Sequence, residues 1–370
     1  MSSIFKNEII FNSPKEDEIE ITLFGPGYGE SAVLKLPDTG WFVIDSCRFA
    51  IGNSKVIPSL EYLKAHNADY IEAIILTHPH EDHYLGLAEI IKEYKGRIRY
   101  VCRYAAEGLR EFKNYLAQQH IARLRNVYEL ATVFKAFEEA KNNGAWPKHL
   151  GELTPIINNP STGAQVIALT PSGESIRRYT ENLYKAIAKV GQYVQPVPDR
   201  LHNLIASAIW ISVGSIRIIL GSDLEEGTDN LTGWYGVLAN PNKPNLSVNV
   251  IKVAHHGSHS AFCKEAWDEH KVNNLPIAIL TPYVKGSNFL PKDADIKRLN
   301  EVASKVGVTS KIKYSNPKRV YSKEVMRLSE SYMKNWYIKE SQKEFGLIRI
   351  RLSKDGIIRE TTTIPPAYWI

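Results

Sequence analysis

The sequence predicts an α/β protein in which two strand-rich layers are sandwiched between helices. Three observations lead to this fold class. Strand-like apolar runs occur in both halves of the chain, segments of helical periodicity separate them, and the composition, 44% hydrophobic and 23% charged, is that of a globular protein. A chain of 370 residues is long enough for one large domain with insertions. We therefore expect a single domain over residues 1–370.

The first third of the chain reads as short strands joined by turns. Apolar runs predict strands over 18–24, 31–36 and 41–45, and Pro37-Asp38-Thr39-Gly40 is typical of a hairpin turn between the last two. The next expected elements are, in chain order, a helix near 60–64, a strand over 70–76, a helix over 86–95 and a strand over 97–102. The chain thus changes from antiparallel strands to alternating strands and helices.

The rest of the chain is expected to hold two helical insertions, further strands and a C-terminal extension. Apolar residues recur at helical spacing from about 104 to 148 and from about 175 to 200. A strand-rich extension is expected over about 310–370. The remaining predicted elements are strands over 165–169, 207–213, 215–220, 248–253, 276–280 and 347–352, and a helix over 292–306 that Gly307 ends.

The composition favours a cytoplasmic protein without a membrane partner. The three cysteines, Cys47, Cys102 and Cys263, are far apart and form no CxxC pair, so neither a disulfide framework nor a thiolate zinc site is expected. No apolar run approaches the roughly 20 residues of a membrane helix, and the first residues lack the layout of a signal peptide. A net charge of +6 mildly favours an anionic substrate, nucleic acid being one candidate.

Potential metal ligands are concentrated just after the strand predicted at 70–76. The segment His78-Pro79-His80-Glu81-Asp82-His83 places three histidines and an aspartate in one turn. Imidazole and carboxylate groups are the usual nitrogen and oxygen ligands of zinc and related metals. His255 and His256 follow the strand predicted at 248–253. A lone histidine is usually structural, but two clusters that each follow a strand predict a shared metal-binding rim.

The spacing His78-x-His80-x-Asp82-His83 resembles the signature of the metallo-β-lactamase superfamily. The resemblance covers roughly residues 18–320. It implies an αββα four-layer sandwich with helical insertions and a binuclear metal site at one edge of the sheets. Within the superfamily, the pairing of Gly-Ser-Asp with His-His-Gly-Ser is most similar to the nuclease-like domain of DNA-uptake competence channel proteins.

The resemblance also implies roles for single residues around two divalent ions, Zn or Mn. Asp45 resembles the early aspartate that supports the metal ligands, and Asp223 resembles the carboxylate that bridges both ions. The implied ligands of the first ion are His78, His80 and His202, and those of the second are Asp82, His83 and His256. Asn203 is an alternative to His202, and His255 is an alternative to His256 as the last ligand.

The predicted activity is that of a two-metal-dependent hydrolase. The resemblance implies a phosphodiesterase or nuclease that acts on nucleic acid or a nucleotide-derived substrate through a metal-bridging hydroxide. The predicted catalytic residues are Asp82, which would orient the water, His255, which would donate a proton to the leaving group, and Asp45. Two alternatives stay open: hydrolysis of a lactam, lactone or thioester, and a non-catalytic binding or regulatory module of the same fold.

Two further segments have open interpretations. Gly25-Pro26-Gly27-Tyr28-Gly29 lies between two predicted strands and is interpreted as a turn, or as a frame for the site. Arg177 and Arg178 in the second helical insertion could contact an anionic substrate, although a solvated helix face explains them as well.

Overall fold

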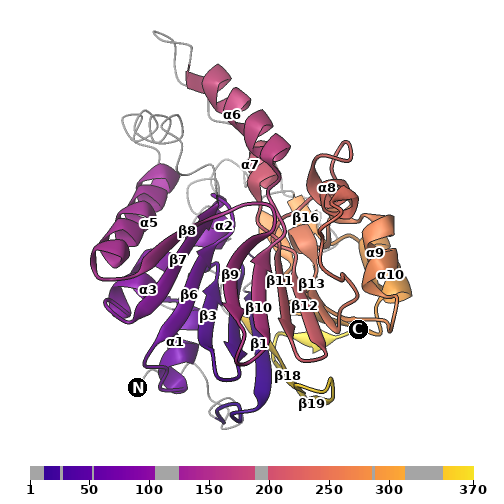
Figure 1. Cartoon of the computed structure of the whole chain (residues 1–370), viewed down its shortest axis with the longest axis horizontal. Helices are drawn as coiled ribbons and strands as arrows, with labels where there is room; N and C mark the ends of the chain where they lie inside the picture. The colour runs from indigo at the N-terminus through magenta and orange to yellow at the C-terminus, as the bar shows by residue number, and fades with distance from the viewer. Residues whose placement is uncertain are drawn as a thin grey trace, which may run out of the picture.

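The computed structural model describes residues 12–25, 28–51, 54–104, 125–187, 199–285, 288–312 and 345–370. Two eight-stranded sheets stand face to face, and helices cover their outer sides (Figure 1). This is the αββα sandwich of the metallo-β-lactamase fold, and the predicted fold class is confirmed. None of the described helices has the length and hydrophobicity needed to cross a bilayer.

The first sheet comes mostly from the N-terminal half of the chain. Its strands lie in the order β19-β18-β1-β2-β3-β6-β7-β8, antiparallel as far as β3 and parallel from β3 to β8. Their bounds are β1 Glu18–Gly25, β2 Ser31–Leu36, β3 Gly40–Ile44, β6 Ile71–Leu76, β7 Ile98–Tyr104, β8 Trp146–Leu150, β18 Gly346–Ser353 and β19 Ile358–Ile364.

The second sheet has the order β20-β17-β14-β13-β12-β11-β10-β9, with parallel pairing from β17 to β12 and antiparallel pairing elsewhere. Its strands are β9 Thr154–Asn159, β10 Ala164–Ala168, β11 Ile209–Val213, β12 Ile216–Leu220, β13 Val250–Lys252, β14 Ile277–Leu280, β17 Lys305–Val308 and β20 Tyr368–Trp369. Two small hairpins lie outside the sheets: β4 Phe49–Ile51 with β5 Ser54–Val56, and β15 Tyr283–Lys285 with β16 Asn288–Leu290.

The helices form the outer layers. Helices α1, α3 and α5 pack on the first sheet and α8, α9 and α10 on the second, while α6 projects from the edge at which the sheets meet the site (Figure 1). The helices are α1 Pro58–Ala65, α2 Glu81–Tyr84, α3 Leu87–Glu93, α5 Arg125–Asn142, α6 Gly173–Ile187, α7 Asp199–His202, α8 Gly233–Ala239, α9 Lys264–His270 and α10 Asp293–Val302. Single turns of 3-10 helix are η3 Asn203–Ile205, η4 Ala254–Gly257 and η5 His259–Ala261.

The central core lies between the two sheets. Because side chains alternate along a strand, Ile19, Ile21 and Leu23 of β1 face the second sheet and join its buried aliphatic residues. Glu20 on the opposite face accepts a hydrogen bond from Tyr62 Oη of α1 at 2.7 Å. The first strand therefore packs against both the opposite sheet and a helix, which explains its complete burial.

The prediction for residues 292–306 is wrong at its C-terminal end. Helix α10 ends at Val302, and Lys305–Val308 forms β17, paired in parallel with β14. A Cβ on Gly307 would lie 2.7 Å from the Trp369 ring, so the glycine allows close packing inside a strand and does not end a helix.

The predicted insertions and extension fall on several elements. The first insertion range contains α5 and the start of β8, and its residues 105–124 lie outside the described residues. The second contains α6 and α7, with residues 188–198 outside. The C-terminal range contributes to both sheets, since β18 pairs with β1 and β20 pairs with β17.

Candidate metal centre

The carboxyl ends of strands from both sheets meet at one edge of the sandwich. Asp45 directly follows β3, and the histidine-rich turn follows β6. From the second sheet, Asp223 follows β12 and His255 and His256 follow β13. Side chains that are remote in the chain are brought together because these strands end on the same side.

Asp45 holds the histidine-rich turn in place. Its Oδ1 accepts a hydrogen bond from Thr77 N at 2.8 Å, and its Oδ2 accepts from Thr77 Oγ1 and from His83 Nδ1, each at 2.7 Å. A protonated Nδ1 on His83 leaves Nε2 as the free lone pair. Asp45 therefore fixes the ring of His83 with Nε2 directed into the site.

The first group of donor atoms consists of His78 Nε2, His80 Nδ1 and Asp223 Oδ2, all within 4.8 Å of one another. The two ring nitrogens are 2.9 Å apart, and they lie 3.7 and 3.9 Å from Asp223 Oδ2. Thr77 Oγ1 donates to Asp45 and so accepts from His78 Nδ1 at 3.0 Å. His78 Nε2 is therefore a lone pair that faces another nitrogen, an arrangement that a proton or a cation bridges.

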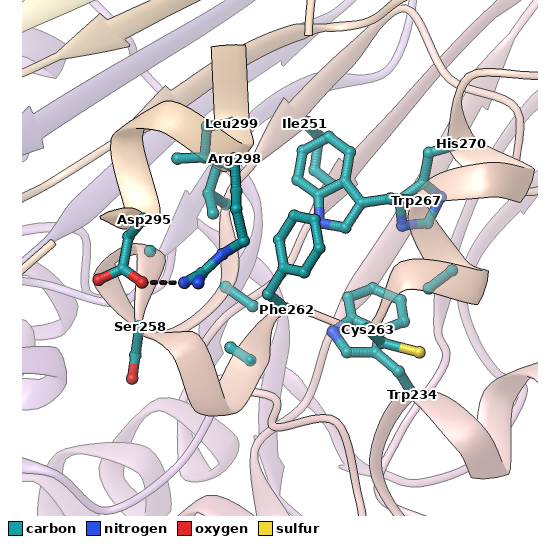
Figure 2. A pocket seen from close by; sticks show the side chains of 15 residues that line it. Trp234, Ile251, Ser258, Phe262, Cys263, Trp267, His270, Asp295, Arg298 and Leu299 are labelled. Carbon is teal, nitrogen blue, oxygen red and sulfur yellow. Dashed lines mark hydrogen bonds and ion pairs between the residues drawn. The ribbon is translucent and has the colours of Figure 1, made fainter. Parts of the chain in front are cut away.

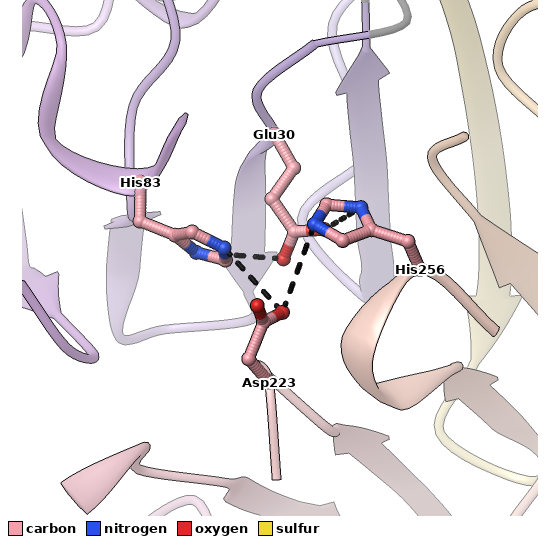
Figure 3. Close-up of side chains that lie close together, drawn as sticks. All are labelled: Glu30, His83, Asp223 and His256. Carbon is pink, nitrogen blue, oxygen red and sulfur yellow. Dashed lines mark ion pairs between the residues drawn. The ribbon is translucent and has the colours of Figure 1, made fainter. Parts of the chain in front are cut away.

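The second group lies on the other side of Asp223, and Figure 3 shows most of it. His83 Nε2 and His256 Nε2 are 3.4 and 3.8 Å from Asp223 Oδ1. Asp82 Oδ2 lies 3.2 Å from His256 Nε2 and 3.7 Å from His83 Nε2. Asp223 thus directs one carboxylate oxygen at each group.

The donor atoms of the two groups fit divalent cations. Asp223 Oδ1 and His83 Nε2 are buried and form no hydrogen bond within the described part of the chain. A buried polar atom without a hydrogen bond is costly, and a cation between these atoms would remove that cost. Imidazole nitrogen with carboxylate oxygen is the donor set that zinc and manganese accept. The chemistry of the site therefore agrees with the cofactors expected from the sequence, without identifying the metal.

The charges in the site are strongly coupled. Burial by itself would raise the pKa of Asp223, but His83 and His256 hold that pKa well below its usual value. Burial would lower the pKa of His83, but Asp223, Asp82 and Asp45 raise it well above the ordinary histidine value. A proton on His83 therefore compensates the carboxylates when no cation does. Cation binding is expected to release this proton and to weaken at low pH.

Glu30 and Lys252 form a buried ion pair behind the second group, and the sequence did not indicate either residue. Lys252 Nζ also donates to Ser222 O at 3.1 Å, and Thr281 Oγ1 donates to the other Glu30 oxygen at 2.7 Å. The Glu30 carboxylate lies 3.6 Å from His256 Nδ1, on the ring edge that faces away from Asp223. Although Glu30 is close enough to be a ligand (Figure 3), both its oxygens are occupied, so we interpret it as a support for the histidines.

The structure separates the two histidines of the second cluster. His256 Nδ1 donates to Thr281 O at 3.0 Å, which leaves Nε2 in the second donor group. His255 lies at the rim with its side chain 20% exposed, 4.0 Å from Asp223 Oδ2 and 3.4 Å from Glu225 Oε1. Both residues adopt left-handed backbone angles, with φ of 46° and 52°. This backbone turn sends the two neighbouring rings to different places.

His202 lies next to the first group but is not one of its clustered donors. Its Nδ1 is 2.8 Å from Tyr179 Oη of α6, and its ring centroid is 5.4 Å from that of His80. Burial lowers the pKa of His202 to about 3, so the ring is neutral. The alternative residue, Asn203, donates from Nδ2 to Glu225 Oε1 at 3.3 Å. A ligand role for His202 stays a prediction.

The arginines of α6 are already paired. Arg177 makes ion pairs with Glu174 and Glu181, and Arg178 pairs with Glu174 and Asp229. Their charges are largely compensated by carboxylates on the same helix and the adjacent loop. This favours the solvated-face interpretation of these two residues.

The comparisons with known proteins agree with this architecture. The model of the metallo-beta-lactamase superfamily matches residues 24–167, which include Asp45 and the turn from His78 to His83. This match and the two-sheet sandwich support membership of that superfamily, whose fold is generally that of metal-dependent hydrolases. A search of curated proteins found no match.

Two solved structures illustrate the likeness. The metallo-beta-lactamase fold protein YhfI from Bacillus subtilis is 12% identical, with a TM-score of 0.41 over 81% of this chain and 98% of YhfI. The E377D mutant of CmlA beta-hydroxylase is 13% identical, with a TM-score of 0.34 over 65% of this chain. This chain covers 36% of the length of that mutant.

Proposed function

We propose that the protein is a two-metal-dependent phosphodiesterase or nuclease that acts on nucleic acid or a nucleotide-derived substrate. One observation carries this proposal: two donor groups lie on opposite oxygens of a single buried carboxylate, Asp223. Two cations held side by side in this way suit the in-line displacement at a phosphodiester. When bound, they supply Lewis acidity at the phosphoryl oxygens and lower the pKa of water.

The residues around the donors have separate roles in this proposal. Asp82, on the first turn of α2, directs Oδ2 at the second group and would accept a hydrogen bond from the attacking water. His255 is the exposed histidine of the rim, and Glu225 lies within 3.4 Å of its Nδ1. Glu225 would keep that nitrogen protonated and orient the ring, so that His255 Nε2 can donate a proton to the leaving oxygen.

The test is an activity screen with added Mn or Zn. Bis(p-nitrophenyl) phosphate, single-stranded DNA, RNA and cyclic nucleotides represent phosphodiesters, and nitrocefin and a lactone panel represent acyl substrates. We expect cleavage of phosphodiesters that Asp82→Ala and Asp223→Ala reduce at least about 100-fold, since both remove groups used by the reacting centre. Asp268→Ala, on the exposed surface of α9, is the matched control.

Each outcome of this screen leads to a decision. Activity on acyl substrates alone would favour the lactam, lactone or thioester alternative. A protein that binds no metal by elemental analysis and cleaves nothing would favour the non-catalytic module. Equal activity of Asp82→Ala and the wild type would mean that another site is responsible.

A further inference from the structure

Two tyrosines and a lysine form a cluster beside the second donor group. Tyr28 follows β1, and Tyr283 and Lys285 belong to the β15 strand of a small hairpin. The Tyr28 and Tyr283 ring centroids are 5.5 Å apart, and Lys285 Nζ lies 5.3 Å from the centroid of the Tyr28 ring. We call Tyr28, Tyr283 and Lys285 the rim cluster.

Polar contacts hold the rim cluster in one arrangement. Tyr28 Oη donates to Glu81 Oε2 at 2.8 Å and accepts from Lys285 Nζ at 3.2 Å. Lys285 Nζ also lies 3.5 Å from Glu81 Oε2. Burial and the nearby Asp82 and Glu81 raise the pKa of Tyr28, so the phenol stays protonated. Preorganised side chains lose little conformational freedom when they bind a ligand.

The rim cluster touches the donor groups directly. The Tyr283 ring centroid is 5.1 Å from that of His256, with an angle of 38° between the rings. Glu81, which anchors both Tyr28 and Lys285, immediately precedes Asp82 in the chain. The segment after Tyr28 is fixed as well, because Glu30 N donates to Asp82 O at 2.9 Å. A ligand held at the two donor groups would therefore meet this cluster.

The fold does not need the rim cluster for its core. The β15–β16 hairpin is a separate two-stranded sheet among the described elements, and it belongs to none of the three buried clusters. Tyr283 is half-buried, and the Lys285 side chain is 50% exposed. An aromatic and cationic cluster that is ordered, partly exposed and adjacent to a polar site is typical of a ligand-binding wall.

We propose that the rim cluster binds the nucleoside side of a phosphodiester substrate. The aromatic surface of Tyr283 contacts the nucleobase, and the Lys285 ammonium attracts the phosphate charge next to it. Aromatic side chains accept any base because every base has a π face, and a lysine recognises a phosphate as a point charge. This inference rests on the proposed function and names its substrate class as nucleoside phosphodiesters.

The test compares two esters with the same leaving group. The p-nitrophenyl ester of thymidine 5′-phosphate carries a nucleoside, and methyl p-nitrophenyl phosphate does not. We expect Tyr283→Leu to raise KM about tenfold for the thymidine ester only, and Tyr283→Phe to restore it. Lys285→Met should raise KM for both esters and reduce the dependence of kcat/KM on salt. Lys305→Met is the matched control, because Lys305 also lies over an aromatic ring, that of Trp369, but begins β17 at the far end of the sheet.

The failure of this inference differs from the failure of the proposed function. Equal KM values of the wild type for the two esters, or equal effects of Tyr283→Leu on both, would overturn the rim cluster and leave phosphodiester hydrolysis in place. Cleavage of neither ester would overturn the proposed function. Binding of thymidine 5′-phosphate, measured by calorimetry, then decides the rim cluster: a tenfold weakening in Tyr283→Leu supports it, and an unchanged affinity overturns it.

Discussion

The ring nitrogens that face away from the donor groups are each held by a protein group. Asp45 accepts from His83 Nδ1, Thr77 lies at His78 Nδ1, and Thr281 O accepts from His256 Nδ1. A hydrogen bond at one ring nitrogen fixes the tautomer and leaves the other nitrogen as a lone pair. The direction of each histidine therefore depends on residues outside the donor groups.

Asp45→Asn tests this dependence at a single atom. The amide keeps the shape of the side chain, and asparagine tolerates the left-handed backbone that Asp45 adopts, with φ of 56°. It lowers the acceptor strength at His83 Nδ1, so we expect metal affinity to fall about 10- to 100-fold. Competition with a chelator of known affinity measures the change.

Asp38→Asn is the matched control for that experiment. Asp38 has a similar φ of 51° but lies exposed in the turn between β2 and β3. We expect its metal affinity to equal that of the wild type. An unchanged affinity in Asp45→Asn would contradict the role assigned to Asp45.

The Glu30–Lys252 pair supports a prediction on stability. Lys252→Met leaves the buried Glu30 carboxylate without its cation, and breaking a buried ion pair costs about 3–5 kcal/mol. Urea unfolding with excess chelator measures this loss without any contribution from metal binding. The double variant Glu30→Gln with Lys252→Met should recover part of the stability.

A surface pair provides the comparison. Lys354 lies 3.3 Å from Asp38, and both side chains are exposed, so Lys354→Met should cost less than about 1 kcal/mol. If the two lysine variants lost the same stability, the Glu30–Lys252 pair would not be the buried support that the structure indicates.

The sequence revealed some of these residues and concealed others for a physical reason. The donor-rich turns were visible because histidine and aspartate are unusual at that density after an apolar strand. Glu30, Lys252 and Tyr179 are single polar residues without a pattern, and only the fold shows that they are buried beside the site. The one available signal was a lysine inside the apolar strand Val250–Lys252.

At the scale of elements, η4 and η5 rest on an apolar wedge beneath the site (Figure 2). In this wedge the His270 ring packs against Trp234 and Trp267, with ring centroids 5.3 and 5.7 Å away. His270 Nδ1 donates to Leu246 O at 3.0 Å. The neutral ring thus ties α9 to the segment that precedes β13.

The pKa of His270 makes this wedge sensitive to acid. Burial lowers the pKa to about 4, whereas the unfolded chain has a value near 6.5. The unfolded state binds more protons between these values, so the stability from His270 is complete above pH 6.5 and is lost as the pH falls towards 4. The expected loss is about 3 kcal/mol by pH 4.

Urea unfolding at pH 7 and at pH 4.5, with excess chelator, measures this loss. We expect His270→Gln to lose about 2 to 3 kcal/mol less than the wild type over this interval, since the glutamine does not titrate. His259→Gln changes an exposed histidine of η5 and should follow the wild type. An acid dependence in His270→Gln equal to that of the wild type would contradict the assignment.

The elements themselves were predictable where their pattern is long enough. Strands such as β2 and β6 are continuous or alternating apolar runs with turn residues at their ends, and their predicted bounds lie within one residue of the structure. The hairpin strands β4, β5, β15 and β16 have three residues each, too few for a period to show. The strand β17 was absorbed into the preceding helix because four residues fit either period.

At the scale of the whole molecule, the donor groups depend on both sheets. The first sheet supplies Asp45 and the turn that contains His78, and the second supplies Asp223 and His256. Local patterns predict that strands exist but not which distant strands pair. The pairing of β1 with β18 joins residues 18–25 to residues 346–353, and no pattern within either segment indicates the other.

Gly346 lies where the C-terminal strands close the two sheets, and it supports the last prediction. A Cβ at this position would lie 1.7 Å from Thr309 O, just after β17 of the second sheet, and 2.6 Å from Ala367 N. Backbone atoms cannot move aside as a flexible side chain can, so we expect Gly346→Ala to cost about 3 kcal/mol or more. Thermal and urea unfolding measure the loss. Gly173→Ala, at the start of α6, meets no atom within 4 Å and should change stability by less than about 0.5 kcal/mol. If Gly346→Ala were as stable as that control, the sheets would not need this close approach.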